Sequence, residues 1–308
     1  MELRQLKIFS TVARERNFTR AAELLGYAQS NVTAQVRLLE DEFGTKLFER
    51  LGKRVYLSPD GEKLLQYANQ ILKLSSEAKD ALATSAVPHG TITIGVAESL
   101  CVFRLPMLFK EYCKRYPQIK LILKLGASAD FYRWLRDNTI DIAFFLNPEI
   151  TATDLVSVTF LPEPMVIVSN TEHRLVRKGY IEPGDLQDEC LILTERGCSY
   201  RAALEKILNE AGIQPHSTLE FGSIEAIKQF TAGGLGIALL PRAAVEIELQ
   251  HNRMADLHWV GPGINMYTQV VYHKDKWLSP TLVSLLDLLK EYLPATGDGP
   301  SCSTIAQL

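Results

Sequence analysis

Cysteine is scarce in this sequence, and long apolar runs are missing. The 308 residues include five cysteines, an odd number without Cys-x-x-Cys spacing, which argues against a zinc site and a disulfide framework. No apolar segment approaches about 18 residues, and the charged N-terminus lacks the apolar core of a signal peptide. We therefore expect a cytoplasmic protein with reduced thiols, no cofactor, no metal and no membrane span.

The net charge is small but unevenly distributed. Its formal value is −3, which argues against a general nucleic-acid coat. Residues 1–58 hold 10 Lys and Arg against 7 Asp and Glu, whereas the remaining 250 residues hold 23 against 29. A basic head on an acidic body is typical of a DNA-binding module attached to a part that must not bind DNA.

Residues 18–37 predict two short helices joined by a tight turn. An amphipathic helix over 3–16 precedes them. Thr19 is a favoured N-cap for the second helix, which Gly26 ends by accepting a left-handed backbone. The third helix carries an apolar stripe at helical spacing, formed by Val32, Val36, Leu39 and Phe43.

The opposite face of this third helix is small and polar. It carries Ser30, Thr33, Ala34 and Arg37, flanked by Gln29 and Asn31. Small side chains let the helix approach a DNA groove closely, and amides and hydroxyls suit base edges. Arg37 lies deeper along the helix, where it suits a phosphate. The alternative is the solvated face of an ordinary three-helix bundle.

The segment that follows predicts a β-hairpin with a basic tip, in which Arg50, Lys53 and Arg54 surround Gly52. A helix-turn-helix followed by a basic hairpin is a winged helix, whose wing can grip the DNA backbone or minor groove. The candidate DNA-binding residues are therefore Thr19, Arg20, Gln29, Ser30, Asn31, Thr33, Arg37, Arg50, Lys53 and Arg54.

A long helix should begin at Ser58-Pro59-Asp60, which supplies an N-cap, a proline at the first position and an acid in the first turn. It is expected to reach residue 84, about 40 Å at 1.5 Å per residue. Its apolar stripe comprises Leu64, Leu65, Ala68, Ile71, Leu72, Ser75, Ala78 and Leu82. We expect a second copy of the chain to cover this stripe in a coiled-coil-like dimer. The alternative is packing against the chain's own body.

Beyond residue 90, predicted strands and helices alternate. Strands are expected at 91–96, 119–125, 141–145, 165–169, 190–194, 217–221, 236–241 and 269–273. This rhythm predicts a mostly parallel sheet covered by helices. Gly233-Gly234-Leu235-Gly236 precedes a strand instead of opening a helix, which excludes a dinucleotide-binding fingerprint. No catalytic signature is visible.

Polar side chains gather where predicted strands end and helices begin, the places where α/β folds bind ligands. Helix N-termini favour a carboxylate or phosphate as ligand. Serines at these junctions would donate hydrogen bonds to it, and Arg201 could pair with its negative charge. Each serine could instead cap its own helix. The candidate effector-binding residues are Glu98, Ser99, Leu100, Ser128, Thr194, Cys198, Ser199, Tyr200, Arg201, Phe221 and Ser223.

Cys198 offers a different interpretation. A thiol at a helix start beside Arg196 and Arg201 could have a lowered pKa and act as a redox or electrophile sensor. The alternative, which we favour, is a small buried residue, because Cys190 is the only other cysteine nearby in the sequence.

The order and spacing of several motifs are specific. They run through LRQLKIFSTVARERNFTRAAELLGYAQSNVTAQVRLLEDEFGTKLFER, then LSPDGEKLL, with GLGIALLP near residues 234–241. Together they resemble the LysR-type transcriptional regulators from Met1 to about residue 293. Two positions depart from the family pattern. Ala28 stands where a capping Ser or Thr is frequent, so Ser30 could cap instead, and Ala34 stands where Arg or Lys is frequent. Both departures shift the expected base contacts to Gln29, Asn31 and Thr33.

The resemblance implies a multidomain chain: an all-α winged helix-turn-helix, a linker helix, and an α/β body of two Rossmann-like subdomains similar to type 2 periplasmic binding proteins. The expected divisions are 1–58 for DNA binding, 59–88 for the linker and 89–294 for the body. Within the body, subdomain I is 91–161 with 267–294, subdomain II is 162–266, and 295–308 is a disordered tail.

The expected partners are double-stranded DNA, a small effector between the subdomains, and further copies of the chain in a homodimer or homotetramer. A transcriptional regulator can also contact RNA polymerase. A different function class stays open, namely an enzyme or solute-binding body whose head only oligomerises. The basic hairpin argues against that class.

Overall fold

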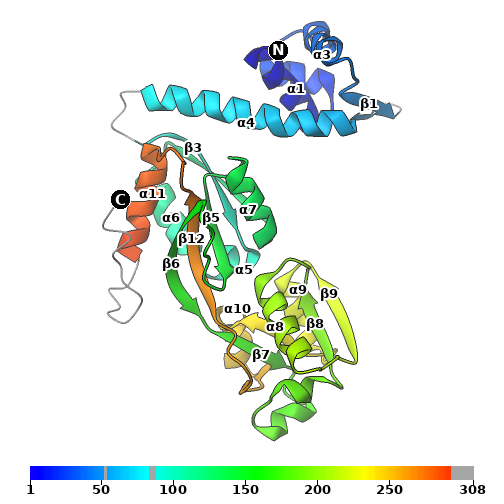
Figure 1. Cartoon of the computed structure of the whole chain (residues 1–308), viewed down its shortest axis with the longest axis vertical. Coiled ribbons are helices and arrows are strands. Elements are labelled where there is room, and N and C mark those ends of the chain that lie inside the picture. The colour runs from blue at the N-terminus through cyan, green and yellow to red at the C-terminus, as the bar shows by residue number, and fades with distance from the viewer. Residues whose placement is uncertain (52–53, 83–87, 293–308) are drawn as a thin grey trace. The chain divides into compact units, whose positions relative to one another are not determined.

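The computed structural model describes residues 1–51, 54–82 and 88–292, with the backbone alone at 50, 51, 54, 80, 160 and 292. The chain divides into two compact units, a head that ends with helix α4 and a body that begins with strand β3 (Figure 1). Lys53, residues 83–87 of the linker and the tail 295–308 lie outside the described residues, and the predictions for them stay predictions.

Three helices form the core of the head: α1 (Leu3–Glu15), α2 (Phe18–Leu25) and α3 (Gln29–Phe43). Their inward faces bury Leu6, Phe9, Val12, Ala21, Ala22, Val32, Val36 and Leu39. Gly26 follows α2 with φ at +68°, the left-handed conformation that glycine adopts most easily. The predicted helix-turn-helix is therefore confirmed.

Three details of these helices were predicted wrongly. Asn17, not Thr19, caps α2, because its Oδ1 accepts the N–H groups of Thr19 and Arg20 at 2.9 and 3.1 Å. Ser30 does not cap α3, which already begins at Gln29 without a side-chain cap. Phe43 is 46% exposed, because the helix ends there and its last turn extends past the core.

A two-stranded wing follows α3, with β1 (Phe48–Leu51) antiparallel to β2 (Arg54–Leu57). Glu40 on α3 is buried and holds the start of the wing. Its Oε1 accepts the N–H groups of Leu47 and Phe48 at 3.0 and 3.4 Å, and its Oε2 pairs with Lys46 at 2.8 Å. The winged helix is thus fixed by a charge-assisted contact between α3 and the wing.

Helix α4 (Pro59–Leu82) starts as predicted, since Ser58 Oγ accepts the N–H of Gly61 at 3.0 Å. A Cβ on Gly61 would lie 2.1 Å from the Leu47 carbonyl oxygen, so only glycine allows α4 to pass this close to the wing. None of the described helices is both long and apolar enough to cross a membrane.

The apolar stripe of α4 is partly covered by the head itself. Leu64, Leu65, Ala68, Ile71 and Leu72 join the core that α1 lines. The expectation that a second copy of the chain covers this stripe was therefore wrong for its first half. Tyr67, Leu74 and Leu82 are exposed by 63%, 56% and 87%, so an apolar flank remains uncovered within the chain.

The first half of the body is a five-stranded sheet in the order β4-β3-β5-β12-β6. The strands are β3 (Gly90–Val96), β4 (Ile119–Leu125), β5 (Ile142–Asn147), β6 (Leu155–Glu163) and β12 (Met266–His273). Helices α6 (Pro106–Arg115) and α11 (Pro280–Tyr292) cover one face, and α7 (Ser128–Arg136) covers the other (Figure 1). The short helix α5 (Glu98–Phe103) follows β3.

The second half contains two smaller sheets. One has the antiparallel order β10-β7-β11, and the other pairs β8 with β9 in parallel. These strands are β7 (Met165–Ser169), β8 (Cys190–Thr194), β9 (Ser217–Phe221), β10 (Ala238–Pro241) and β11 (Ala255–Asp256). Helices α8 (Ser199–Glu210), α9 (Ile224–Ala232) and α10 (Arg242–Gln250) pack on them.

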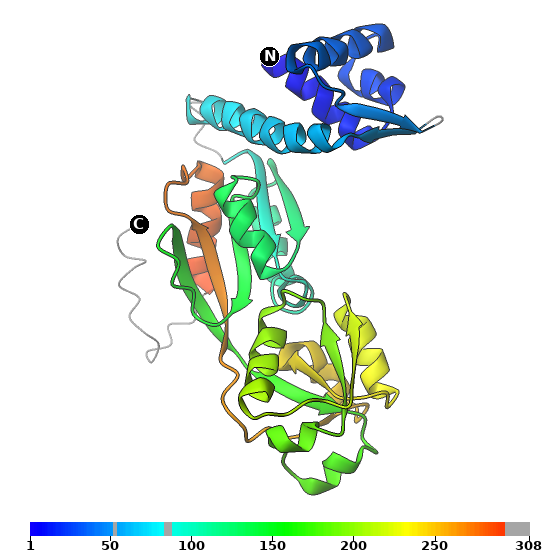
Figure 2. The same ribbon diagram turned by 45° about the vertical axis from the view of Figure 1, so that its right-hand side comes forward.

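The prediction of a mostly parallel sheet was wrong for much of the body. Among the described strands, only β3 with β4 and β5, and β8 with β9, pair in parallel. The chain leaves the first half along β6 and returns along β12 (Figure 2). A strand that returns beside the one that left must run in the opposite direction, so β12 is antiparallel to both β5 and β6.

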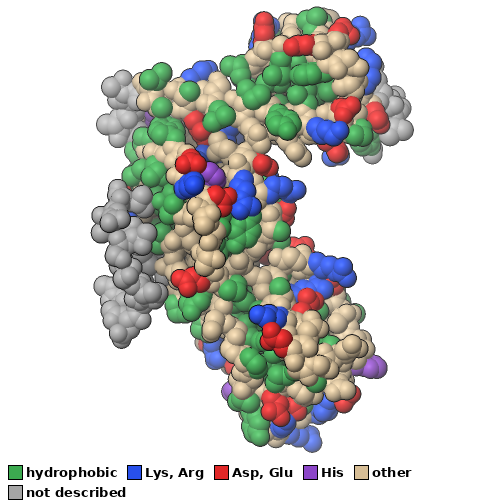
Figure 3. All heavy atoms as spheres, viewed as in Figure 1, with side chains coloured by type: hydrophobic (Ala, Val, Ile, Leu, Met, Phe, Trp, Pro, Cys, Tyr) green, Lys and Arg blue, Asp and Glu red, His purple; other side chains and the backbone are tan. Residues whose placement is uncertain are grey.

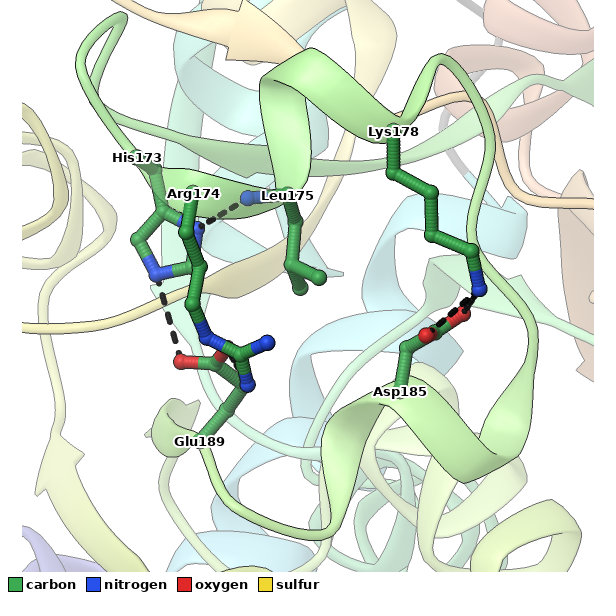
Figure 4. A network of polar contacts seen from close by, with 6 residues as sticks. All are labelled: His173, Arg174, Leu175, Lys178, Asp185 and Glu189. Atoms are coloured by element: carbon green, nitrogen blue, oxygen red, sulfur yellow. Dashed lines mark hydrogen bonds and ion pairs between the residues drawn. The ribbon is translucent and has the colours of Figure 1, made fainter.

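Two 3₁₀ turns that the sequence pattern did not predict, η1 (Arg174–Lys178) and η2 (Pro183–Leu186), cover one end of the second half. Ion pairs hold this segment (Figure 4). Glu189 contacts His173 at 3.2 Å and Arg174 at 2.7 Å, while Lys178 contacts Asp185 at 2.6 Å. We assign these contacts a structural role, since they fasten an otherwise irregular connection.

A buried ion pair sits where the chain crosses between the halves. Glu163 ends β6, and its carboxylate receives two parallel hydrogen bonds from Arg104, Nε to Oε1 at 3.0 Å and Nη2 to Oε2 at 2.9 Å. The Thr268 hydroxyl on β12 donates to the same carboxylate at 2.7 Å. The pair therefore ties both crossing strands to the end of α5.

Replacing Arg104 by alanine should destabilise the body, because it leaves the Glu163 carboxylate, 1% exposed, with Thr268 alone. We expect the free energy of unfolding, measured in urea, to fall by about 2 kcal/mol. This is less than the loss for breaking a fully buried ion pair, because Arg104 is 37% exposed. Arg115→Ala is the matched control: Arg115 is 38% exposed, but its partner Glu291 is 54% exposed. Equal losses in the two variants would contradict the importance of the buried carboxylate.

Candidate DNA-binding surface and effector cavity

The outward face of α3 forms a shallow groove of about 460 Å³, lined by Gln29, Ser30, Thr33, Ala34, Arg37 and Leu38. Gln29 Nε2 donates to Thr33 Oγ1 at 3.0 Å, and Thr33 Oγ1 donates to the Gln29 carbonyl at 3.0 Å. These two side chains are thus held in one orientation on a single flank of the helix. The small Ala34 leaves the helix backbone accessible beside them.

The other candidate DNA-binding residues are more dispersed. Asn31 does not line the groove. Thr19 and Arg20 are exposed at the start of α2, where Arg20 Nε donates to Glu15 at 3.3 Å. Arg50 and Arg54 lie on β1 and β2, with their side chains outside the description. Over the face of the body in Figure 3, acidic and basic side chains are intermingled instead of forming a basic surface.

The body contains a cavity of about 290 Å³ between its two halves. Nine of the candidate effector-binding residues line it: Glu98, Ser99, Ser128, Thr194, Cys198, Ser199, Tyr200, Phe221 and Ser223. They come from the start of α5 and α7 in the first half, and from the ends of β8 and β9 and the start of α8 in the second. The strand-to-helix junctions therefore converge on one cavity, between the subdomains where the resemblance placed an effector.

Two candidates do not reach this cavity. Leu100 is 1% exposed in the core of the body. Arg201 donates to Glu205 and to Glu220, at 2.7 Å each, and lies outside the cavity lining. Each is the third residue of its helix. The helical rotation therefore turns its side chain away from those of the first two residues, which face the cavity. The expectation that Arg201 would pair with an anion there was wrong.

Sequence reasoning also missed residues that line the cavity. Leu125 and Leu146 end or nearly end β4 and β5, and Glu195 follows β8. The ends of the predicted strands were a usable signal for the two leucines. Glu195 directly follows the candidate Thr194 but was not itself among the candidates, although it adds a second carboxylate to the cavity wall.

The four serines do not cap their own helices. Ser128 Oγ lies 2.9 Å from Asn147 Oδ1, and the Ser199 hydroxyl donates to the Leu146 carbonyl in the other half of the body. Ser223 precedes α9 without a side-chain cap bond, and Ser99 lies inside α5, whose N-cap position is Ala97. The alternative interpretation of these serines as helix caps was therefore wrong.

Glu98 also connects the two halves. Its Oε2 accepts the N–H of Ile224, the first residue of α9, at 3.3 Å. Burial raises the pKa of the Glu98 carboxyl, the Ile224 N–H acts in the opposite direction, and the nearby Glu195 raises it further. The free N–H group at the start of α9 is thus already occupied by a carboxylate of the protein itself.

The Cys198 thiol is not activated. Burial raises its pKa, and Arg201 is engaged by two carboxylates. The sensor interpretation, which needs a lowered pKa, is therefore disfavoured, because burial outweighs the hydrogen bonds that act in the opposite direction. The described cysteines, Cys101, Cys113, Cys190 and Cys198, are free thiols. Within the described ranges, no group of three or more metal-ligating side chains occurs.

Comparison with known proteins identifies the family to which this architecture corresponds. Residues 3–62 match the description "Bacterial regulatory helix-turn-helix protein, lysR family", and residues 85–294 match "LysR substrate binding domain". The regulator YwqM of Bacillus subtilis, described as uncharacterized, is 41% identical over 292 residues, covering 94% of this chain and 99% of that one.

Solved structures share the fold. Full-length OxyR from Pseudomonas aeruginosa, in a Cys-to-Asp variant, aligns with a TM-score of 0.71 at 24% identity, covering 94% of this chain and 95% of that one. The regulatory domain of CcmR from Synechocystis, in complex with 2-PG, aligns with a TM-score of 0.62 at 27% identity, covering 68% and 99%. The chain therefore belongs to the LysR family of transcriptional regulators, which combine a DNA-binding helix-turn-helix with an effector-binding domain and are not enzymes.

Proposed function

We propose that a small effector bound in the cavity between the two halves of the body controls DNA binding by the head. The cavity carries this proposal, because both halves contribute to its wall and Glu98 and Ser199 hydrogen-bond across it. A ligand there changes the preferred separation of the halves, since it interacts with both at once. The 2-PG complex of the CcmR regulatory domain supports a ligand-binding role for this body.

We assign sequence reading to α3. Gln29 and Thr33 share one flank of the groove, and their mutual hydrogen bond fixes the amide for a base edge. Arg37 suits a phosphate, and Arg50, Lys53 and Arg54 of the wing would supply further backbone contacts. Thr19, Arg20, Ser30 and Asn31 are secondary candidates. The weaker case for Asn31 rests on its position outside the groove.

We also propose that α4 joins two chains. Its uncovered apolar flank, with Tyr67, Leu74 and Leu82, has the helical spacing that a second α4 could cover. The proposed division of the chain is 1–58 for DNA binding, 59–88 for dimerisation and 89–294 for effector binding. Pairs of dimers would form a tetramer, and RNA polymerase is a further proposed partner.

The DNA-reading assignment can be tested by gel shift on DNA from beside the protein's own gene. Gln29→Ala or Thr33→Ala should cost about 1–3 kcal/mol on the preferred sequence and much less on unrelated duplexes. Arg50→Ala or Arg54→Ala should weaken all duplexes alike and make binding less salt-dependent. A Gln29 variant that kept the full sequence preference would refute the role of this flank.

Dimerisation through α4 predicts that Leu74→Glu shifts the chain toward the monomer in light scattering after size exclusion, because a charge would be buried in the interface. Ser76→Glu is the control on the same helix, since Ser76 is exposed and lies away from the apolar flank. If both variants kept the oligomeric state of the parent chain, α4 would not be the dimer contact.

A thiol-sensing function through Cys198 is disfavoured by its raised pKa. At pH 7 the thiol stays protonated, and the thiolate forms only as the pH rises above the ordinary value of 9.0. Alkylation by iodoacetamide, followed by mass spectrometry, should therefore be slower at Cys198 than at exposed Cys113 and should accelerate only in strong alkali. Rapid labelling of Cys198 at pH 7 would restore the sensor hypothesis.

A further inference from the structure

The charges in the effector cavity all have one sign. Among the described residues that line it, Glu98 and Glu195 carry carboxylates, and no lysine, arginine or histidine is present. The other titratable side chains in the wall stay neutral at pH 7, because burial raises the pKa of both the Cys198 thiol and the Tyr200 phenol. The charged side chains of the cavity wall are therefore all acidic.

Three donors that would attract an anion are already in use. The Ile224 N–H at the start of α9 donates to Glu98, and the Ser199 hydroxyl donates to the Leu146 carbonyl. Ser128 Oγ is paired with Asn147. An anion alone would have the hydroxyls of Ser99 and Ser223 and the backbone N–H groups of α7 and α8, while lying near two carboxylates.

Acceptors, in contrast, are available. A carboxylate offers about four lone-pair positions, and the Ile224 N–H uses one of those on Glu98. Glu195 is exposed at the rim. Thr194 is 9% exposed and lines the cavity, where its hydroxyl lies beside the Cys198 thiol and the Tyr200 phenol and keeps a lone pair for a further donor. A ligand with several N–H donors would satisfy these three groups.

The remainder of the wall limits the size and polarity of the ligand. Leu125, Leu146 and Phe221 supply apolar surface from both halves of the body. A volume of about 290 Å³ is at the low end for small-molecule sites. The ligand is consequently a small molecule with an apolar portion beside its charged group.

We propose that the effector carries a protonated amino group, held by Glu98 and Glu195 with the Thr194 hydroxyl as a further acceptor, and a short apolar chain. This inference rests on the proposed role of the cavity as the effector site. Simple amines and amino acids share this chemistry. In an amino acid the carboxylate would face the first turns of α7 and α8, whose N–H groups favour a negative charge.

Three probes of matched shape separate these classes: L-leucine, isoamylamine without the carboxylate, and 4-methylpentanoate without the amine. Together with the other amino acids and their deaminated acids, they are titrated into the full chain by calorimetry. The amine-bearing member of each matched pair should bind about tenfold or more tightly than its deaminated acid, since a charged hydrogen bond is lost. If isoamylamine is the only one of the three that binds, the effector is a simple amine. If L-leucine binds more tightly than both other probes, the effector is an amino acid.

Glu98→Gln should reduce the affinity for the tightest amine-bearing probe about tenfold or more, because Gln keeps an acceptor for Ile224 but removes the charge. The Glu210→Gln control removes an exposed carboxylate on α8 outside the cavity and should leave binding unchanged. Any of three results would overturn the amine inference. The deaminated acids could bind as tightly as the amines, the Glu98→Gln variant could keep the full affinity, or no probe could bind.

The proposed function has a separate readout. Bulky substitution of the cavity wall, as in Ala127→Trp, should change DNA binding in the gel shift if the cavity communicates with the head. If Ala127→Trp alters the gel shift but no amine binds, the amine class is rejected and the effector site is kept. If Ala127→Trp leaves the gel shift unaltered, the effector site itself is rejected.

Discussion

The body depends on one buried carboxylate at the point where the chain crosses between its halves. Glu163 ends β6, and its carboxylate accepts hydrogen bonds from Arg104, which directly follows α5, and from Thr268 on β12. An isolated carboxylate this deeply buried would be unfavourable, so the crossing strands and α5 have to keep their relative positions. The other end of α5 presents Glu98 to the cavity. The crossing and the ligand-facing carboxylate are therefore joined by a single short helix.

The same logic governs the cavity, where the halves meet through a small number of polar contacts. The bonds from Ile224 to Glu98 and from Ser199 to Leu146 each link one half to the other. Since such bonds contribute little net free energy individually, a ligand that competes for or reinforces them can shift the balance between arrangements of the body. The negative charge of Glu98 and Glu195 then decides which ligands are favoured.

The head shows which structural features can be predicted from patterns along the chain. The apolar periodicity of α3 and the capping residues of α4 predicted where these helices run, because spacing and cap chemistry are local. The partner of the α4 stripe is not local. Gly61 permits α4 to pass beside the wing, and Ala68 and its neighbours then pack on α1. A stripe that seemed available to a second chain is thus half used within its own domain, and Tyr67 and Leu74 carry what is left.

The sequence by itself determined the family, the winged helix-turn-helix and most of the cavity wall, since strand ends and helix starts are readable from periodicity and breakers. It could not determine strand direction, so the antiparallel return of β12 was missed. Nor could it determine which way a first-turn side chain points: Arg201 turns toward Glu205 and Glu220, Leu100 turns into the core, and Glu98 reaches Ile224. Those outcomes depend on neighbours far away in the chain, and only the tertiary structure brings these neighbours together and sets the charge of the cavity.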